Sequence, residues 1–212
     1  MMAEHKLALL VGSLGCAGCG ASWFVPPVYG VQFMALGLPA NAITLSDVLA
    51  RLEPTLMALP VGMLVDKCGV GRVYVLTLVL CCILAPPPLF YWWTHTPKES
   101  AIVSVFVGQV LLGFATSLTT SVYLWVIELF PVRVRATGVA VAYNIGIGVF
   151  GGMGPLISDA GNEVIDPRGP IAAPALFTLV AGLISLAAVG ASFLLSRRGH
   201  LQLTHIRHSP YW

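Results

Sequence analysis

Residues 128–139 read Glu-Leu-Phe-Pro-Val-Arg-Val-Arg-Ala-Thr-Gly-Val and separate two long apolar runs of the sequence. The run before this junction stops at Pro131, and the run after it begins at Ala136. An apolar stretch of about 20 residues is long enough to cross the roughly 30 Å hydrocarbon core of a bilayer as a helix. We therefore expect a short polar turn between two transmembrane helices, with Arg133 and Arg135 at one membrane surface.

The composition of the whole chain supports a membrane protein. Of its 212 residues, 57% are hydrophobic and only 9% are charged, and the mean hydropathy is +0.87. A water-soluble domain carries more charge than this. We expect an all-α membrane protein that forms a single six-helix bundle over residues 1–212, with a cytoplasmic tail at 196–212. The expected spans are residues 7–36, 42–65, 73–93, 101–129, 136–157 and 171–195.

The distribution of Lys and Arg predicts the orientation of these spans. Lys98 and Arg168 fall on one side of the membrane, and Arg51 lies inside a span. The other eight basic residues fall on the opposite side: Lys6, Lys67, Arg72, Arg133, Arg135, Arg197, Arg198 and Arg207. Because cytoplasmic loops are enriched in Lys and Arg, both termini are predicted to be cytoplasmic. The net charge of +2 is small and dispersed, so nucleic acid is not an expected partner.

The sequence gives little support for an enzyme. A six-span intramembrane protease would need a nucleophile and a base within the membrane, but Gly12-Ser13-Leu14-Gly15 lacks the serine placement of Gly-x-Ser-x-Gly. All five histidines lie outside the expected spans. The spacing of Cys16 and Cys19 is compatible with zinc or redox chemistry, but packing in an apolar helix is the favoured interpretation. We expect free thiols, no metal and no cofactor.

Two motifs resemble a known transporter family. Residues 128–139, followed by Tyr143-Asn144, Phe150-Gly-Gly and Pro155-Leu156, resemble the junction between the tenth and eleventh helices of the major facilitator superfamily. Within that superfamily the stretch is most similar to the metabolite:proton symporters, the branch of proline/betaine, α-ketoglutarate and shikimate permeases. Residues 62–72, Gly-Met-Leu-Val-Asp-Lys-Cys-Gly-Val-Gly-Arg, are similar to the signature loop between helices eight and nine.

The resemblance implies one half of a major facilitator fold. A complete member has twelve helices in two six-helix halves, and this chain resembles only the carboxy-terminal half. The resemblance therefore implies secondary active, proton-coupled transport of a small polar or anionic metabolite across the plasma membrane. The other participants would be H⁺, the lipid bilayer, and a second six-helix half or a homodimer partner. The alternative is a truncated, non-transporting fragment or a regulatory half-transporter.

Three ionisable residues lie inside the second expected span: Asp47, Arg51 and Glu53. A charge at the centre of a membrane helix costs roughly 2.5 to 3.5 kcal/mol, so these residues are expected to be paired or to face water. Asp47 and Arg51 are four residues apart and share one helix face. In the functional interpretation, Arg51 binds an anionic substrate group and Glu53 or Asp47 takes the coupling proton. In the structural alternative, an ion pair and a neutral glutamic acid only help the helices to pack.

A second group of charges is expected at the cytoplasmic surface. The resemblance implies that Asp66, Arg72, Glu128 and Arg135 form a gate that pairs when the cytoplasmic side closes. It also implies that Asp66 accepts hydrogen bonds at the amino end of the fifth helix, where backbone donors and the helix dipole favour an anion. The alternative is that the arginines only satisfy the positive-inside rule.

Other polar and small residues lie within the spans. Gln109, Tyr143 and Asn144 are suited either to line a substrate path or to hydrogen-bond between helices. Gly148 and Gly152 have the small-xxx-small spacing of close helix contacts, which we interpret as packing rather than as a dimer motif.

Overall fold

The computed structural model describes residues 5–35, 40–97, 100–165, 172–198 and 201. Within these ranges the chain is helical and holds no strand. The α-helices are α1 (Lys6–Ala35), α2 (Ala40–Cys68), α3 (Val70–Leu78), α4 (Pro86–His95), α5 (Ala101–Ser117), α6 (Ser121–Glu128), α7 (Arg135–Gly152), α8 (Gly154–Ile165) and α9 (Ala172–Arg197). A π-helical turn, Val79–Leu84, joins α3 to α4, and a 3₁₀ turn, Leu118–Thr120, joins α5 to α6.

The predicted all-helical membrane fold is confirmed. Five stretches in the described ranges are long and apolar enough to cross a membrane: Lys6–Tyr29, Val70–Trp93, Phe106–Glu128, Arg135–Gly161 and Ala173–Arg197. Helix α2, with 29 residues, is long enough to be the sixth, and it carries the ionisable residues Asp47, Arg51 and Glu53.

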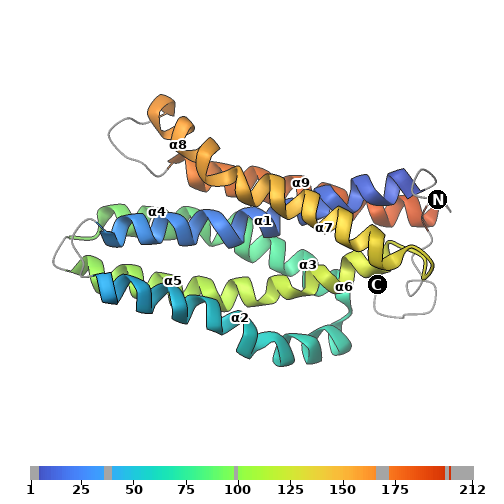
Figure 1. The fold of residues 1–212 in the computed structure, drawn as a ribbon, viewed down its shortest axis with the longest axis horizontal. Helices are drawn as coiled ribbons and strands as arrows, with labels where there is room; N and C mark the ends of the chain where they lie inside the picture. Colours follow the sequence, from blue (N-terminus) through green and yellow to red (C-terminus); the bar gives the residue numbers. More distant parts are fainter. Residues whose placement is uncertain (1–4, 36–39, 98–99, 166–171, 199–200, 202–212) are drawn as a thin grey trace.

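The helices pack in two layers (Figure 1). We call α7, α1, α5–α6 and α2 the front layer, because α1 contacts α7 and α5, and α5 contacts α2. The back layer consists of α9 and α3–α4, which contact each other and cover one side of α1 and α6. Helix α1 is the most buried span, since it has neighbours in both layers. The side of the front layer that the back layer leaves uncovered is therefore where a site shared with a second bundle would lie.

Two spans that the sequence predicts as continuous helices are interrupted side by side. Two hydrogen bonds link the interrupted helices: Thr77 Oγ1 of α3 donates to the Leu118 carbonyl of the 3₁₀ turn at 3.1 Å, and Cys81 Sγ of the π-helical turn donates to the Ala115 carbonyl of α5 at 2.8 Å. The Ala115 and Leu118 carbonyls also accept a backbone N–H of their own segment, so these side-chain donors add a link between the helices. Helix α4 then begins with Pro86, Pro87 and Pro88, whose missing N–H groups are not needed in a first turn.

The helical structure of the fifth span continues beyond residue 157, where the sequence predicts that the span ends. After a break at Met153 the helix continues as α8 to Ile165, through residues polar enough to suggest a loop. These residues are held by the neighbouring helices: the Tyr29 hydroxyl donates to Asp159 Oδ1 at 2.6 Å, and Ser158 is buried. Tertiary packing therefore overrides the local polarity.

The turn between the second and third spans is shorter than predicted. Cys68, expected in a loop, is the last residue of α2, and α3 begins at Val70. The single residue between them is Gly69, with φ of 87°, a conformation that residues with a Cβ rarely adopt. The prediction that all five cysteines are free thiols is confirmed.

Glycines allow α1 and α7 to approach closely. A Cβ on Gly146 would lie 2.4 Å from the Ser13 carbonyl oxygen, and a Cβ on Gly20 would lie 3.0 Å from the backbone of Gly151. In contrast, a Cβ on Gly148 or Gly152 would meet no atom within 4 Å. The packing role predicted for Gly148 and Gly152 is therefore wrong within this chain, and Gly146 has that role instead.

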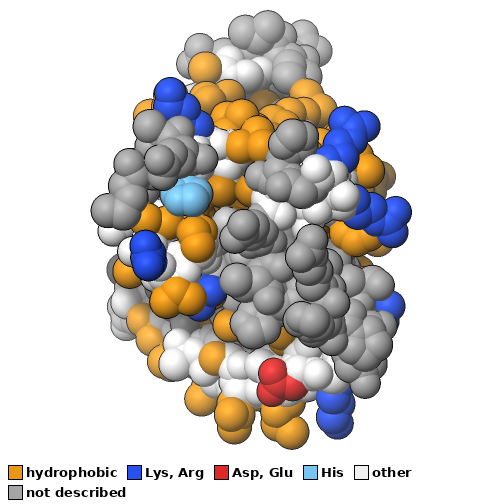
Figure 2. Space-filling view, turned by 90° about the vertical axis from the view of Figure 1, so that its right-hand side faces the viewer, with side chains coloured by type: hydrophobic (Ala, Val, Ile, Leu, Met, Phe, Trp, Pro, Cys, Tyr) orange, Lys and Arg blue, Asp and Glu red, His pale blue; other side chains and the backbone are white. Residues whose placement is uncertain are grey.

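Basic side chains gather at one end of the bundle, where α2 and α9 end and where α3 and α7 begin (Figure 2). The exposed basic residues at the helix ends there are Lys6, Lys67, Arg72, Arg133, Arg197 and Arg198. Lys98, Arg168 and Arg207 lie outside the described residues. We call this the basic end; its location at the cytoplasmic surface stays a prediction.

Candidate functional site

An aromatic cluster joins three helices of the front layer. We call Trp23, Tyr123 and Tyr143 the aromatic patch. The ring centroids of Trp23 and Tyr123 are 6.2 Å apart, and those of Tyr123 and Tyr143 are 4.7 Å apart in a stacked arrangement. The two tyrosine hydroxyls are hydrogen-bonded to each other, and Trp23 Nε1 donates to Thr119 Oγ1. The patch thus combines flat apolar rings with hydroxyl groups from α1, α6 and α7.

The aromatic patch faces away from the back layer. Tyr123 and Trp125 are two residues apart on α6 and therefore point in roughly opposite directions. Trp125 is buried and packs on Tyr74 of α3, with centroids 5.2 Å apart, whereas Tyr123 is exposed. Tyr143 lies eight residues after Arg135, so it is about 12 Å from the start of α7 along the helix. The patch is consequently within the depth of the hydrocarbon core.

Asn144 extends this polar surface along α7. It is exposed, and its Nδ2 donates to the Ala140 carbonyl at 2.7 Å. Gly148 and Gly152 follow at four-residue spacing and form an exposed stripe with Asn144. Gln109, the third polar residue singled out in the sequence, is only 2% exposed and belongs to the interior. The structure therefore separates Tyr143 and Asn144 from Gln109.

Sequence reasoning missed Trp23, Thr119 and Tyr123. Each stands in an apolar run without a charged neighbour, and their contacts span 96 and 20 residues of sequence. One signal in the sequence could have identified them. A Tyr or Trp in the middle of a span carries a polar O–H or N–H group, and such a group usually has a hydrogen-bond partner when it is buried.

Glu53 points into the bundle from the midpoint of α2. At four-residue spacing it shares a helix face with Met57, Val61 and Val65, of which the two valines are buried. Glu53 Oε2 is itself buried and has no hydrogen-bond partner among the described residues. Asp47 is partly buried, and the side chain of Arg51 lies outside the described part of the structure. The pairing of Asp47 with Arg51 therefore stays a prediction.

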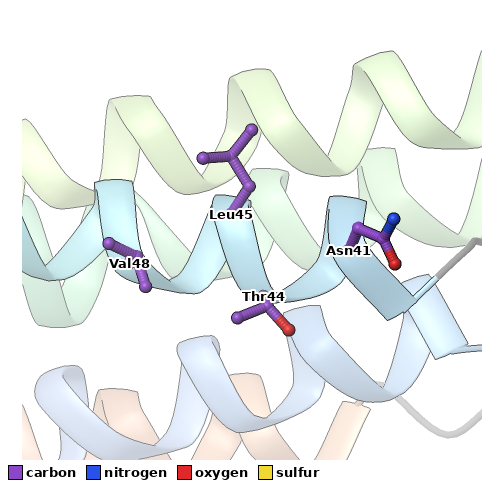
Figure 3. A pocket seen from close by; sticks show the side chains of 4 residues that line it. All are labelled: Asn41, Thr44, Leu45 and Val48. Atoms are coloured by element: carbon purple, nitrogen blue, oxygen red, sulfur yellow. The ribbon is translucent and has the colours of Figure 1, made fainter.

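A shallow pocket of about 430 Å³ lies along the first turns of α2. It is lined by Asn41, Thr44, Leu45 and Val48 (Figure 3). Leu45 points to the opposite side of the helix from Thr44 and Val48 in this view. The pocket is adjacent in sequence to Asp47 and combines an amide and a hydroxyl with apolar walls.

The four predicted gate residues lie at the basic end. Asp66 and Arg72 are exposed at the junction of α2 and α3, while Glu128 and Arg135 are half-buried at the junction of α6 and α7. Arg135 Nε donates to the Phe130 carbonyl at 3.2 Å. Asp66 has no hydrogen-bond partner among the described residues, so its capping of α7 stays a prediction, as does the Glu128–Arg135 pair.

Comparison with known proteins identifies the family. The sequence model of the Major Facilitator Superfamily matches residues 11–204, which is most of the chain. No curated protein and no solved structure matches the chain. Since the match covers most of the chain, the chain belongs to the major facilitator superfamily of membrane transporters.

Proposed function

We propose that this chain is the carboxy-terminal six-helix half of a proton-coupled symporter for a small polar or anionic metabolite, most similar to the metabolite:proton branch and located in the plasma membrane. The aromatic patch on the front layer carries this proposal. The hydroxyl groups of Tyr123 and Tyr143 and the amide of Asn144 each make one hydrogen bond within the chain and can form more, and lipid tails cannot supply the remaining partners. Tyr123, Tyr143 and Asn144 are therefore better accounted for by a polar cavity than by lipid.

A second bundle supplies the other wall of that cavity. Alternating access in this kind of transporter is a rocking of one bundle against another around a central site. The stripe of Gly148 and Gly152 on α7 lets a helix from the second bundle approach closely, because no atom of the described residues occupies that space. The second bundle is a matching amino-terminal half or, in the less direct alternative, another copy of this chain.

The ionisable residues of α2 have separate roles in this proposal. Arg51 presents a planar guanidinium, which can bind a carboxylate in a bidentate manner. Glu53 is the proton carrier, since burial of a carboxyl oxygen without a partner favours the neutral form, and opening of the cavity to water favours the ionised form. Asp47 remains the alternative carrier, one helix turn from Arg51.

The basic end is the gate. Glu128 and Arg135 flank the short junction between α6 and α7, so a pair between them would tie the two helices that carry Tyr123 and Tyr143. Asp66 and Arg72, at the tight turn after α2, complete the gate around the amino end of α7. Pairing of these four residues closes the cytoplasmic side, and their separation opens it.

The proposal is tested by uptake into liposomes that contain the full chain and an amino-terminal six-helix half of the same branch. Proline, glycine betaine, α-ketoglutarate and shikimate serve as substrates, with an imposed proton gradient. We expect accumulation of at least one of them, abolished by an uncoupler. Accumulation that is indifferent to the uncoupler would overturn proton coupling, and no binding or uptake of any of the four would overturn the assignment to this branch.

A further inference from the structure

A groove runs between α3 and α9 on the back layer, away from the aromatic patch. Its volume is about 630 Å³, and its walls are mostly apolar side chains. The lining residues are Gly71, Arg72, Val75, Leu76, Val79, Leu186, Val189, Gly190 and Phe193. Gly190 leaves the groove open because its missing side chain would meet no other atom within 4 Å. Since a second bundle docks on the front layer in our proposal, this groove faces the bilayer.

The groove has a cationic end and an apolar end. Helix α3 begins at the basic end and α9 terminates there, so Arg72 and Phe193 lie at that end of the groove. The guanidinium of Arg197 lies over the Phe193 ring, 4.4 Å from its centroid. Arg72 lines this end of the groove and Arg197 lies against its lining residue Phe193, while Val79 and Leu186 are farther from the basic end along α3 and α9. The seven residues from Arg72 to Val79 correspond to about 10 Å, within the roughly 15 Å of one leaflet.

We propose that this groove binds one anionic phospholipid, with an acyl chain along the apolar walls and the phosphate between Arg72 and Arg197. The groove matches an acyl chain in polarity and in depth, and Arg72 and Arg197 supply positive charge at its basic end. Arginine is well suited to this contact, because its planar fork binds phosphate oxygens in a bidentate manner. A second copy of the chain is a poorer occupant, because a symmetric contact would bring four like charges together at the mouth.

The test is native mass spectrometry of the purified full chain, equilibrated with phosphatidylglycerol or phosphatidylcholine of identical acyl chains. We expect one phosphatidylglycerol to be retained about five-fold more strongly than phosphatidylcholine, the effect of roughly one basic residue at an anionic surface. Soluble glycerol phosphate at the same concentration should not displace it. Equal retention of the two lipids, or displacement by glycerol phosphate, would overturn the proposal.

Two variants locate the lipid. Gly190→Leu fills the groove at a position with open space, and it should remove the retained lipid while helix content and unfolding temperature are kept. Gly148→Leu is the matched control, since it makes the same exchange at an open position on α7 and should retain the lipid. Arg197→Gln, at the exposed end of α9, should bring phosphatidylglycerol retention close to that of phosphatidylcholine. Full retention in a folded Gly190→Leu chain, or equal loss in Gly148→Leu, would show that the lipid sits elsewhere.

Discussion

The phenol rings of Tyr123 and Tyr143 stack with their centroids 4.7 Å apart, and their hydroxyl groups share a hydrogen bond. The pair joins α6 to α7 directly above the junction that Glu128 and Arg135 flank in the sequence. A movement of the gate residues would therefore also move the helices that carry the aromatic patch. In the proposed transporter, this pair is where substrate contact and gating meet.

Removing one hydroxyl of this pair should weaken substrate binding without unfolding the bundle. Tyr143→Phe keeps the stacked ring but loses the hydrogen bond, which is worth about 1 kcal/mol, so we expect a roughly five-fold higher half-saturation concentration for uptake. Uptake kinetics, normalised to the amount of protein in the membrane, provide the measurement. Tyr91→Phe is the control, since Tyr91 is exposed on α4 of the back layer. Unchanged kinetics in Tyr143→Phe would assign the pair to packing alone.

Glu53→Gln should uncouple transport from the proton gradient. The amide keeps the shape of the neutral acid but cannot release a proton, so gradient-driven accumulation should be lost while exchange of substrate across the membrane persists. Both are measured in the same liposomes, with and without an imposed gradient, and the exchange reaction controls for folding. If Glu53→Gln still accumulates substrate against its gradient, the coupling proton is carried by another group, with Asp47 the next to test.

Much of the fold follows from hydropathy alone, because each span must bury its backbone in its own helix. The positions where helices are interrupted or extended cannot be predicted from hydropathy. Beside the two interruptions, Thr77 of α3 donates a hydrogen bond to the Leu118 carbonyl, and in α8 the side chain of Asp159 accepts one from Tyr29 of α1. No pattern within one span encodes such partners.

The sequence also could not indicate that Gly146, and not Gly148, makes the close contact between α1 and α7. This difference gives a stability prediction. Gly146→Ala forces a Cβ against the Ser13 carbonyl and should destabilise the bundle by about 1 to 3 kcal/mol through overpacking. Gly148→Ala meets open space and should be neutral or slightly stabilising. Thermal unfolding in detergent, followed by circular dichroism, compares the two. Equal stability of both variants would contradict the close α1–α7 approach.

The gate is tested through Cys68, which is partly exposed at the basic end of α2. The other four cysteines are buried, so a maleimide added from the cytoplasmic side should report mainly on Cys68. Neutralising Glu128 by Glu128→Gln should favour the open state by about 1 kcal/mol, a roughly five-fold population change, and speed labelling accordingly. Cys68→Ser provides the background. A loss of membrane abundance with unchanged labelling would instead indicate a role in folding or topology.

The candidate site was only partly readable from the sequence. Asp47, Arg51 and Glu53 are conspicuous because charge is costly in a membrane, whatever the neighbours are. Trp23 and Tyr123 are not conspicuous in the sequence. Their role depends on which helices are neighbours in the fold and on which side of the front layer the back layer covers. Adjacent helices in the front layer are distant in sequence, as α1 and α7 show.

The central claim, that this chain works as one half of a two-bundle transporter, is tested most directly by comparing the chain alone with the paired assembly. Liposomes containing only residues 1–212 should show no accumulation of proline, glycine betaine, α-ketoglutarate or shikimate under an imposed proton gradient. Addition of a matching amino-terminal half should restore accumulation. Uphill transport by the chain alone would contradict the account and require a homodimer, whereas no transport by the assembled pair would leave the chain as a non-transporting half.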